Sequence, residues 1–156
     1  MIEWLGDIRP SEFQAILDKH ERVLIGGTVE SGKSLLLETT KPNRRWIHTD
    51  TWRRQRGTIR AIDSLAEAAS GMPRYLIVGM LVPHILAKGL DADAVLWLAR
   101  SRNPDMGTSD DLQKLVEGWE AEDPENRTAY LAERALHEDE TVVKQKGLAR
   151  RYERQY

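Results

Sequence analysis

Residues 27–34, GTVESGKS, have the types and the spacing that bind phosphate groups. Two glycines enclose four variable positions, and a lysine and a serine follow the second glycine, which is the phosphate-loop pattern. Glycine lets the backbone approach an anion closely, and the N–H groups of the turn and of a following helix form a cradle for it. Lys33 would reach the β- and γ-phosphates of a triphosphate, and Ser34 would hold Mg²⁺. The residues predicted to line the triphosphate are Gly27, Thr28, Val29, Glu30, Ser31, Gly32, Lys33, Ser34 and Leu35.

The sequence on either side of this loop supplies the setting that the pattern requires. Short apolar runs that end in turn residues predict buried strands, and segments with apolar residues three or four apart predict helices. The predicted strands are residues 22–27, 44–50, 74–79 and 94–99, and the predicted helices are residues 11–20, 33–38, 58–71 and 82–89. The loop therefore joins a strand to a helix. The alternative interpretation is a chance match in an ordinary strand-turn-helix connection.

Strands and helices alternate up to Arg100, which is typical of an α/β protein. Parallel neighbours need a crossover that is usually a helix, so the order predicts a three-layer α/β/α fold with a parallel sheet. Ligands of such sheets lie beyond the carboxyl ends of the strands. Ser11 is the expected N-cap of the first helix. The expected buried side of helix 58–71 consists of Ile59, Ile62, Ala66 and Ala69.

The pattern changes after Arg100. Residues 101–109 have the composition of a loop, and residues 109–123 predict an amphipathic helix. The remaining predicted elements are a helix at 124–140, a fifth strand at 140–143 and a basic helical segment at 144–156. We interpret residues 1–156 as one domain with a core at about 22–100 and a lid and C-terminal region at about 101–156.

Composition excludes several classes of protein. The 156 residues suffice for a single domain, and 40% apolar with 31% charged residues are typical of a globular chain. The absence of cysteine excludes disulfides, thiolate metal sites and a cysteine nucleophile. A net charge of −2 argues against a protein that coats nucleic acid. No apolar run reaches the roughly 18 residues that span a bilayer, so we expect no membrane partner and a cytoplasmic location.

A second segment that could do chemistry, HTDTWRRQR at residues 48–56, follows the second predicted strand. A carboxylate such as Asp50 accepts the proton of a hydroxyl, and a guanidinium such as that of Arg53 matches phosphate oxygens. Trp52 among arginines suits stacking on a base. The alternatives are that Asp50 caps a helix, that Trp52 anchors the core and that the arginines lie on a solvated face. The arginines of this region are Arg53, Arg54, Arg56 and Arg60.

The loop and the order of elements from about residue 22 to 100 resemble the P-loop kinases of the adenylate-kinase-like group, especially the small nucleotide, polynucleotide and metabolite kinases. Phage-type polynucleotide kinases have an Asp-x-x-Arg motif at the end of the second strand, and Asp50-Thr-Trp-Arg53 matches it. The resemblance implies a P-loop NTPase fold of the nucleotide-kinase type with a helical lid, and ATP and Mg²⁺ as cofactors. It also implies catalytic roles for Lys33, for Asp50 as general base and for Arg53. The implied metal contacts are Ser34 and Asp50, and the implied acceptor contacts are Asp50, Trp52, Arg53 and Arg54.

The same family closes a lid over ATP after the fourth strand, and arginines of the lid neutralise the phosphates. Arg100 and Arg102 stand at this place in the chain, and Arg127 and Arg134, on the next predicted helix, are alternatives. The other interpretation is that these arginines pair with nearby carboxylates on the surface.

The third strand departs from the family pattern. Many relatives have a carboxylate at or just after this strand, where the present chain has Val78. Either Asp50 and Ser34 manage the metal together with water and substrate oxygens, or the protein binds nucleotide without catalysis. His84, on the following helix, could face the acceptor or be structural.

These expectations favour a kinase that transfers the γ-phosphate of ATP to a hydroxyl of a nucleotide or nucleic acid, either a 5′-hydroxyl or a hydroxymethylated base in DNA. The compact chain resembles phage-encoded kinases of this group. The alternatives are a small-metabolite kinase of the gluconate or shikimate type and a non-catalytic nucleotide-binding module. A motor is disfavoured because motors need a carboxylate that polarises water.

Overall fold

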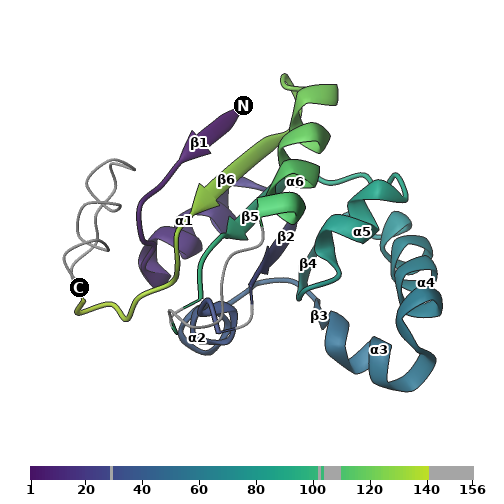
Figure 1. The fold of residues 1–156 in the computed structure, drawn as a ribbon, viewed down its shortest axis with the longest axis horizontal. Helices are drawn as coiled ribbons and strands as arrows, with labels where there is room; N and C mark the ends of the chain where they lie inside the picture. Colours follow the sequence, from purple (N-terminus) through teal and green to yellow (C-terminus); the bar gives the residue numbers. More distant parts are fainter. Residues whose placement is uncertain (29, 102, 104–109, 141–156) are drawn as a thin grey trace.

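The computed structural model describes residues 1–28, 30–101, 103 and 110–140. A sheet of six parallel strands forms its centre, in the order β1-β6-β5-β2-β4-β3 (Figure 1). The strands are β1 (Ile2–Trp4), β2 (Arg22–Gly27), β3 (Trp46–His48), β4 (Tyr75–Val78), β5 (Ala94–Leu98) and β6 (Thr128–Ala132). The helices are α1 (Pro10–Lys19), α2 (Lys33–Thr39), α3 (Thr49–Arg56), α4 (Thr58–Ser70), α5 (Val82–Ala87) and α6 (Asp110–Glu122).

Helices cover both faces of the sheet (Figure 1). On β2, Leu24 belongs to the apolar cluster under α4, α5 and α6, while Val23 and Ile25 belong to the cluster under α1 and α2. Successive residues of a strand point to opposite faces, so a strand buried on both faces must be apolar throughout. The predicted α/β fold with a parallel sheet between two helical layers is therefore confirmed.

The prediction of a helix over residues 124–140 is wrong, because this segment contains β6. Ala129 and Leu131 pack into one apolar cluster, and Tyr130 and Ala132 pack into the other. The strand lies between β5 and β1, which satisfy its backbone on both sides. Alanine, leucine and glutamate favour a helix in isolation, but pairing with two neighbours decides the conformation here.

Three details of the other predicted elements need correction. The second strand ends at His48 instead of residue 50, because β3 pairs with β4 only over its three residues and a helix begins at Thr49. The N-cap of α1 is Arg9, and Ser11 lies inside the helix, where its N–H donates to Glu138. Ile59 is 77% exposed, because its place in the first turn of α4 turns it away from the sheet. The buried stripe of that helix is Ala61, Leu65 and Ala69.

The predicted helix at 109–123 is confirmed as α6, which packs into the fold as part of a layer. Val116 and Trp119 are buried in the cluster under α4 and α5. Residues 104–109 of the expected lid lie outside the described part of the chain. The same holds for residues 141–156, which include most of the expected fifth strand and the basic C-terminal segment.

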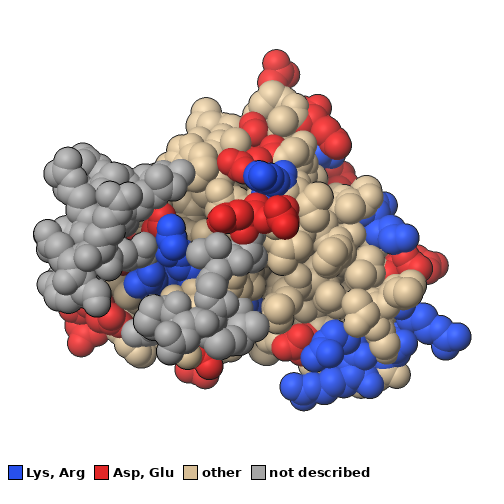
Figure 2. Space-filling model, in the orientation of Figure 1, with Lys and Arg blue, Asp and Glu red and all other residues tan. Residues whose placement is uncertain are grey.

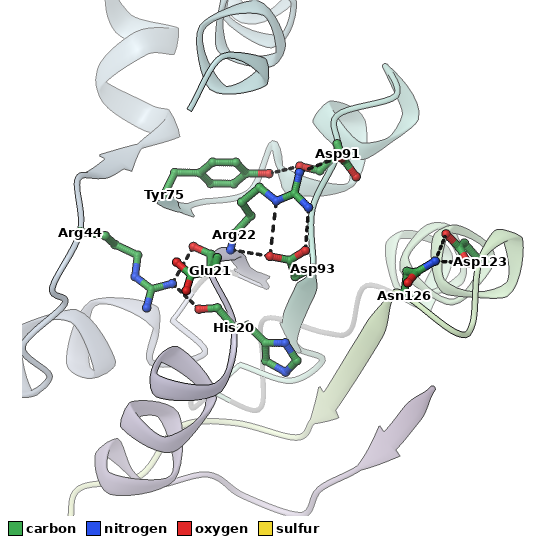
Figure 3. Close-up of polar contacts among 9 residues, drawn as sticks. All are labelled: His20, Glu21, Arg22, Arg44, Tyr75, Asp91, Asp93, Asp123 and Asn126. Atoms are coloured by element: carbon green, nitrogen blue, oxygen red, sulfur yellow. Dashed lines mark hydrogen bonds and ion pairs between the residues drawn. The ribbon is translucent and has the colours of Figure 1, made fainter. Parts of the chain in front are cut away.

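The amino ends of the strands are tied by charged side chains (Figure 3). The Arg22 guanidinium bridges Asp91 at 2.6 Å and Asp93 at 2.8 Å, and the Tyr75 hydroxyl donates to the Asp91 carbonyl. Arg44 donates to the carbonyls of residues 20 and 21. These contacts hold the starts of β2, β4 and β5 together. Among the residues that the structure describes, no helix is long and apolar enough to cross a membrane.

Candidate functional site

The glycine-rich loop lies where β2 ends, between the carboxyl ends of β4 and β5. In the sheet, β4 and β3 lie on one side of β2, and β5 and β6 lie on its other side, so the loop occupies the point where the strand order reverses. Crevices at such points are the usual ligand sites of open parallel sheets. The predicted strand-loop-helix setting of residues 27–34 is therefore present.

Both glycines of the loop are required by their surroundings. A Cβ atom on Gly27 would lie 2.6 Å from the Leu98 carbonyl oxygen, and one on Gly32 would lie 2.6 Å from the Ala135 Cβ atom. Gly32 also has a φ of 102°, which favours glycine. Glu30 has a φ of 59°, an unusual conformation for a residue with a side chain. The loop thus has a specific backbone shape that its neighbours hold.

The Lys33 ammonium group is folded back into the loop. Its Nζ donates to the carbonyl oxygens of Gly27 at 3.0 Å and Thr28 at 2.8 Å. Burial lowers the pKa of Lys33 to about 8, and the charge of Asp50 opposes this effect. The positive charge is therefore incompletely stabilised by the protein and would gain from a bound anion.

Unpartnered polar groups surround this ammonium. The side-chain oxygens of Thr28 and Ser31 are buried and have no hydrogen-bond partner among the described residues. The first N–H groups of α2 have no acceptor within the helix, as at any helix start. A hollow of about 340 Å³ opens beside these groups and is lined by residues 30–35. Buried polar groups normally find partners, so these hydroxyls indicate a place that a polar ligand or water completes.

Two neighbouring segments hold the loop through backbone hydrogen bonds. The Thr28 N–H donates to the Leu98 carbonyl at the end of β5, and the Ala135 N–H donates to the Ser31 carbonyl from the chain that follows β6. Ala135 is fully buried. This support could not be inferred from the sequence, because it comes from a segment that was predicted to be helical.

Asp50 lies in the first turn of α3. The N-cap of this helix is His48, whose Nδ1 accepts a hydrogen bond from the Asp50 N–H at 3.2 Å. The carboxylate is therefore free of the capping role that was the alternative interpretation. Its Oδ1 lies 3.8 Å from the Arg53 Nε atom, and its charge acts on Lys33. The structure thus brings Lys33, Asp50 and Arg53 to the same edge of the sheet.

The other predicted acceptor contacts lie further along α3. Arg54 is exposed, and Trp52 is half-buried and packs against the apolar cluster under α4. The Arg56 guanidinium lies 4.2 Å from the centre of the Trp52 ring. A base could stack on that ring face only after displacing Arg56, so the packing favours the interpretation of Trp52 as a core anchor.

The arginines expected to reach ATP are distributed over both edges of the sheet. Arg100 follows β5 at the carboxyl edge, where its Nε pairs with the buried Glu133 carboxylate at 2.6 Å. Arg134 lies after β6 and Arg127 lies before it, so the prediction that they share a helix is wrong. Arg127 binds the Trp119 carbonyl at the amino edge, which excludes it from the loop. Arg102 lies outside the described residues.

Residues after the third predicted strand do not supply a carboxylate to the site. Val78 is fully buried in the cluster under α1 and α2. Gly79 follows it with a φ of 146°, and a Cβ atom there would lie 1.8 Å from the Thr49 side-chain oxygen. That oxygen is buried and has no partner among the described residues. His84 is exposed on α5.

The residues present could hold Mg²⁺ only if a bound phosphate group and water supplied most of its oxygen ligands. In the part of the chain that the structure describes, no three His, Cys, Asp or Glu side chains are grouped as a metal site would require. Ser34 is exposed at the start of α2, beside Lys33. Mg²⁺ in phosphate sites keeps several waters and takes one or two protein oxygens together with phosphate oxygens. The Ser34 hydroxyl suits that kind of coordination.

The fold and the loop together define a parallel α/β protein with a glycine-rich turn at the switch point of its sheet. Searches of protein-family models, curated proteins and solved structures found no match to this chain. The case for a function therefore depends on the geometry and chemistry of the site itself.

Proposed function

We propose that this protein is an ATP-dependent kinase that transfers the γ-phosphoryl group to a hydroxyl of a nucleotide or nucleic acid. The observation that carries the proposal is the Lys33 ammonium inside a glycine-rich loop at the end of the central strand, with the Asp50 carboxylate close enough to affect its pKa. The two unpartnered hydroxyls of Thr28 and Ser31 support an anionic ligand at the same loop. A cationic cradle and a neighbouring base are the two parts that phosphoryl transfer requires.

In the proposed reaction the acceptor oxygen attacks the γ-phosphorus of ATP and forms a new O–P bond. The bond from that phosphorus to the β–γ bridging oxygen breaks, and ADP leaves with the bridging oxygen. Asp50 accepts the proton that the acceptor hydroxyl loses. Lys33 leaves the Gly27 and Thr28 carbonyls and neutralises phosphate oxygens. Ser34 would hold Mg²⁺, which neutralises charge on the phosphates when it is bound.

Arg53 and Arg100 are the guanidinium groups that the proposal uses. Arg53 lies one helical turn from Asp50 on α3, so it suits charge that develops on the transferred group near the acceptor. Arg100 lies at the end of β5, next to the strand that carries the loop. Its pairing with Glu133 holds it in place, and it would have to share this partner with a phosphate.

The second candidate function is a nucleotide-binding module without catalysis. The observation that favours it is the side chain of Val78, which is buried away from the site and leaves the end of β4 without a carboxylate. The same loop would bind the triphosphate, but no group from β4 would order a metal-bound water. A small-metabolite kinase is a variant of the first proposal with the same base.

The experiment uses radiolabelled ATP and Mg²⁺ with a panel of single-stranded DNA, duplex DNA, hydroxymethylated DNA, nucleosides and polyols. Labelled DNA or nucleotide supports the proposal, a labelled polyol identifies a metabolite kinase, and ATP binding without any labelled acceptor supports the second candidate. Lys33→Ala should abolish ATP binding, whereas Asp50→Asn should retain it and lose roughly 10²-fold or more of the transfer rate. The matched control is Asp63→Asn on α4, an exposed carboxylate paired with Lys88. Full activity of Asp50→Asn would reject the assignment of the base.

A further inference from the structure

Four exposed arginines form a basic face on α3 and the start of α4. Figure 2 shows it as a blue patch at the lower right of the molecule, over the position of α3 in Figure 1. The basic face consists of Arg53, Arg54, Arg56 and Arg60, all of them exposed. Its cations are all arginine, although lysine contributes elsewhere to the surface. The whole chain has a net charge of −2, so this concentration of positive charge is local.

The protein leaves most of this charge uncompensated. Arg54 and Arg60 form no ion pair with any residue that the structure describes, and Arg53 has only the 3.8 Å contact with Asp50. Arg56 donates to a neighbouring glutamine and lies over the Trp52 ring. The nearby Asp63 carboxylate pairs with Lys88 instead of with these arginines. A polyanionic partner would complete these groups.

We infer that the basic face binds a single strand of nucleic acid over several nucleotides, from Arg53 at the candidate site to Arg60 on α4. Planar guanidinium groups match phosphate oxygens, and a row of them matches the repeating charge of a strand. α3 has eight residues and is therefore about 12 Å long, so a strand laid along it would place more than one phosphate on the face. A lone nucleotide bound at Asp50 would leave the far end of the face without a ligand.

The shape and composition of the face favour a single strand over the other polyanions. The chain bends between α3 and α4 at Gly57, which has a φ of 81°. A flexible strand can follow this bend, whereas duplex DNA has a persistence length of roughly 150 base pairs. α3 exposes no apolar side chain, and the start of α4 exposes only Ile59, which is too little for the apolar face that a membrane-surface helix inserts into lipid.

The basic face begins at the candidate site. Asp50 stands in the first turn of α3, and the arginines follow it along the same helix. A strand on these arginines would therefore have its end, or one of its bases, near the Asp50 carboxylate. The further statement that this strand is the phosphate acceptor rests on the kinase function proposed above. The binding of the strand to the basic face does not depend on that function.

The test is fluorescence anisotropy of the full chain with a labelled single-stranded 12-nucleotide DNA, measured over a series of salt concentrations. We expect salt-dependent binding by the wild type. Arg54→Glu combined with Arg60→Glu should weaken it at least tenfold and reduce the slope of log K against log salt by about 1.4, at roughly 0.7 per phosphate contact. The control is Lys19→Glu combined with Lys114→Glu, which changes the net charge equally at exposed positions on α1 and α6. It should bind like the wild type.

Two further arms separate this inference from the kinase proposal. Lys33→Ala should keep the affinity for the strand, because Lys33 lies in the loop, even though it loses ATP. A protein that binds the strand without transferring phosphate would uphold the basic face and reject the kinase. Phosphate transfer to a nucleoside by a protein with no affinity for the strand would uphold the kinase and reject strand binding by the basic face. Equal weakening by both charge-reversal pairs, or tighter binding of polyglutamate or of duplex DNA, would overturn the inference.

Discussion

Replacing Lys33 with methionine should make the unliganded protein more stable while it removes the proposed ATP site. Burial holds the pKa of this lysine at about 8, against 10.5 for a free side chain. The lysine binds its proton more tightly in the unfolded chain than in the folded protein. At any pH where it is protonated in both states, the charged ammonium therefore lowers the free energy of unfolding. The difference of roughly 2.5 in pKa corresponds to about 3 kcal/mol at neutral pH.

Part of this gain is offset by the hydrogen bonds that methionine cannot make. The carbonyl oxygens of Gly27 and Thr28 lose the Nζ donor, which costs about 1–2 kcal/mol. The expected net gain for Lys33→Met at pH 7 is therefore about 1–2 kcal/mol, or a rise in Tm of roughly 2–8 °C for a domain of this size. An exposed control, Lys114→Met on α6, should stay within about 0.5 kcal/mol of the wild type.

The stability difference between the wild type and Lys33→Met should depend on pH in a definite direction. Between pH 8 and 10.5 the unfolded state binds more protons than the folded state, so the unfolding free energy of the wild type rises with pH relative to that of Lys33→Met. The advantage of the variant should be fully present below pH 8, should fall as the pH rises, and should become a deficit of about 1–2 kcal/mol near pH 10.5, because the loss of the two hydrogen bonds remains. Urea denaturation of both proteins at pH 7, 8.5 and 9.5 measures this difference. A variant that is less stable than the wild type by the same amount at every pH would refute the reasoning.

Three other substitutions test the support of the loop and its surroundings. Gly32→Ala should lower stability by about 1–3 kcal/mol in thermal unfolding and weaken ATP binding in calorimetry, because the φ of 102° and the nearby Ala135 resist a Cβ atom. Gly79→Ala should be more damaging, because its Cβ atom would lie 1.8 Å from the Thr49 oxygen, and a second change, Thr49→Ala, should restore part of the stability. A double-mutant cycle of Arg100→Ala and Glu133→Ala in chemical denaturation should give a coupling of about 1–3 kcal/mol, and a value near zero would remove the structural role of that pair.

The central part of the fold could be predicted from the sequence because its strands are buried on both faces. Runs such as residues 22–27 and 94–98 are apolar throughout, and the glycines of the loop stand out against them. The edge of the sheet could not be predicted in this way. β1 has only three residues, too few to show a period, and β6 has helix-forming residues whose conformation is decided by pairing between β5 and β1.

The candidate site was predictable to the extent that it depends on local sequence. The loop motif and the position of Asp50 after the second strand follow from residues that are close to one another in the chain. The contacts of Ala135 and Glu133 do not, because they require the placement of a strand about one hundred residues downstream of the loop. One residue of the predicted buried side of α4 was also wrong: Ile59 is exposed in the first turn, whereas Ala69 is buried and Ile62 and Ala66 pack against the core.

The hydrogen bond from Ala135 to Ser31 has a consequence for attempts to reduce this protein to a minimal unit. An excised segment of residues 22–100 would contain the whole phosphate-loop motif, yet it would lack the alanine that fills the space beside Gly32 and the N–H that holds the Ser31 carbonyl. The loop therefore depends on residues outside the motif for its conformation. Grafting its eight residues onto another strand and helix would transfer the motif without the packing and hydrogen bond of Ala135 that support the turn.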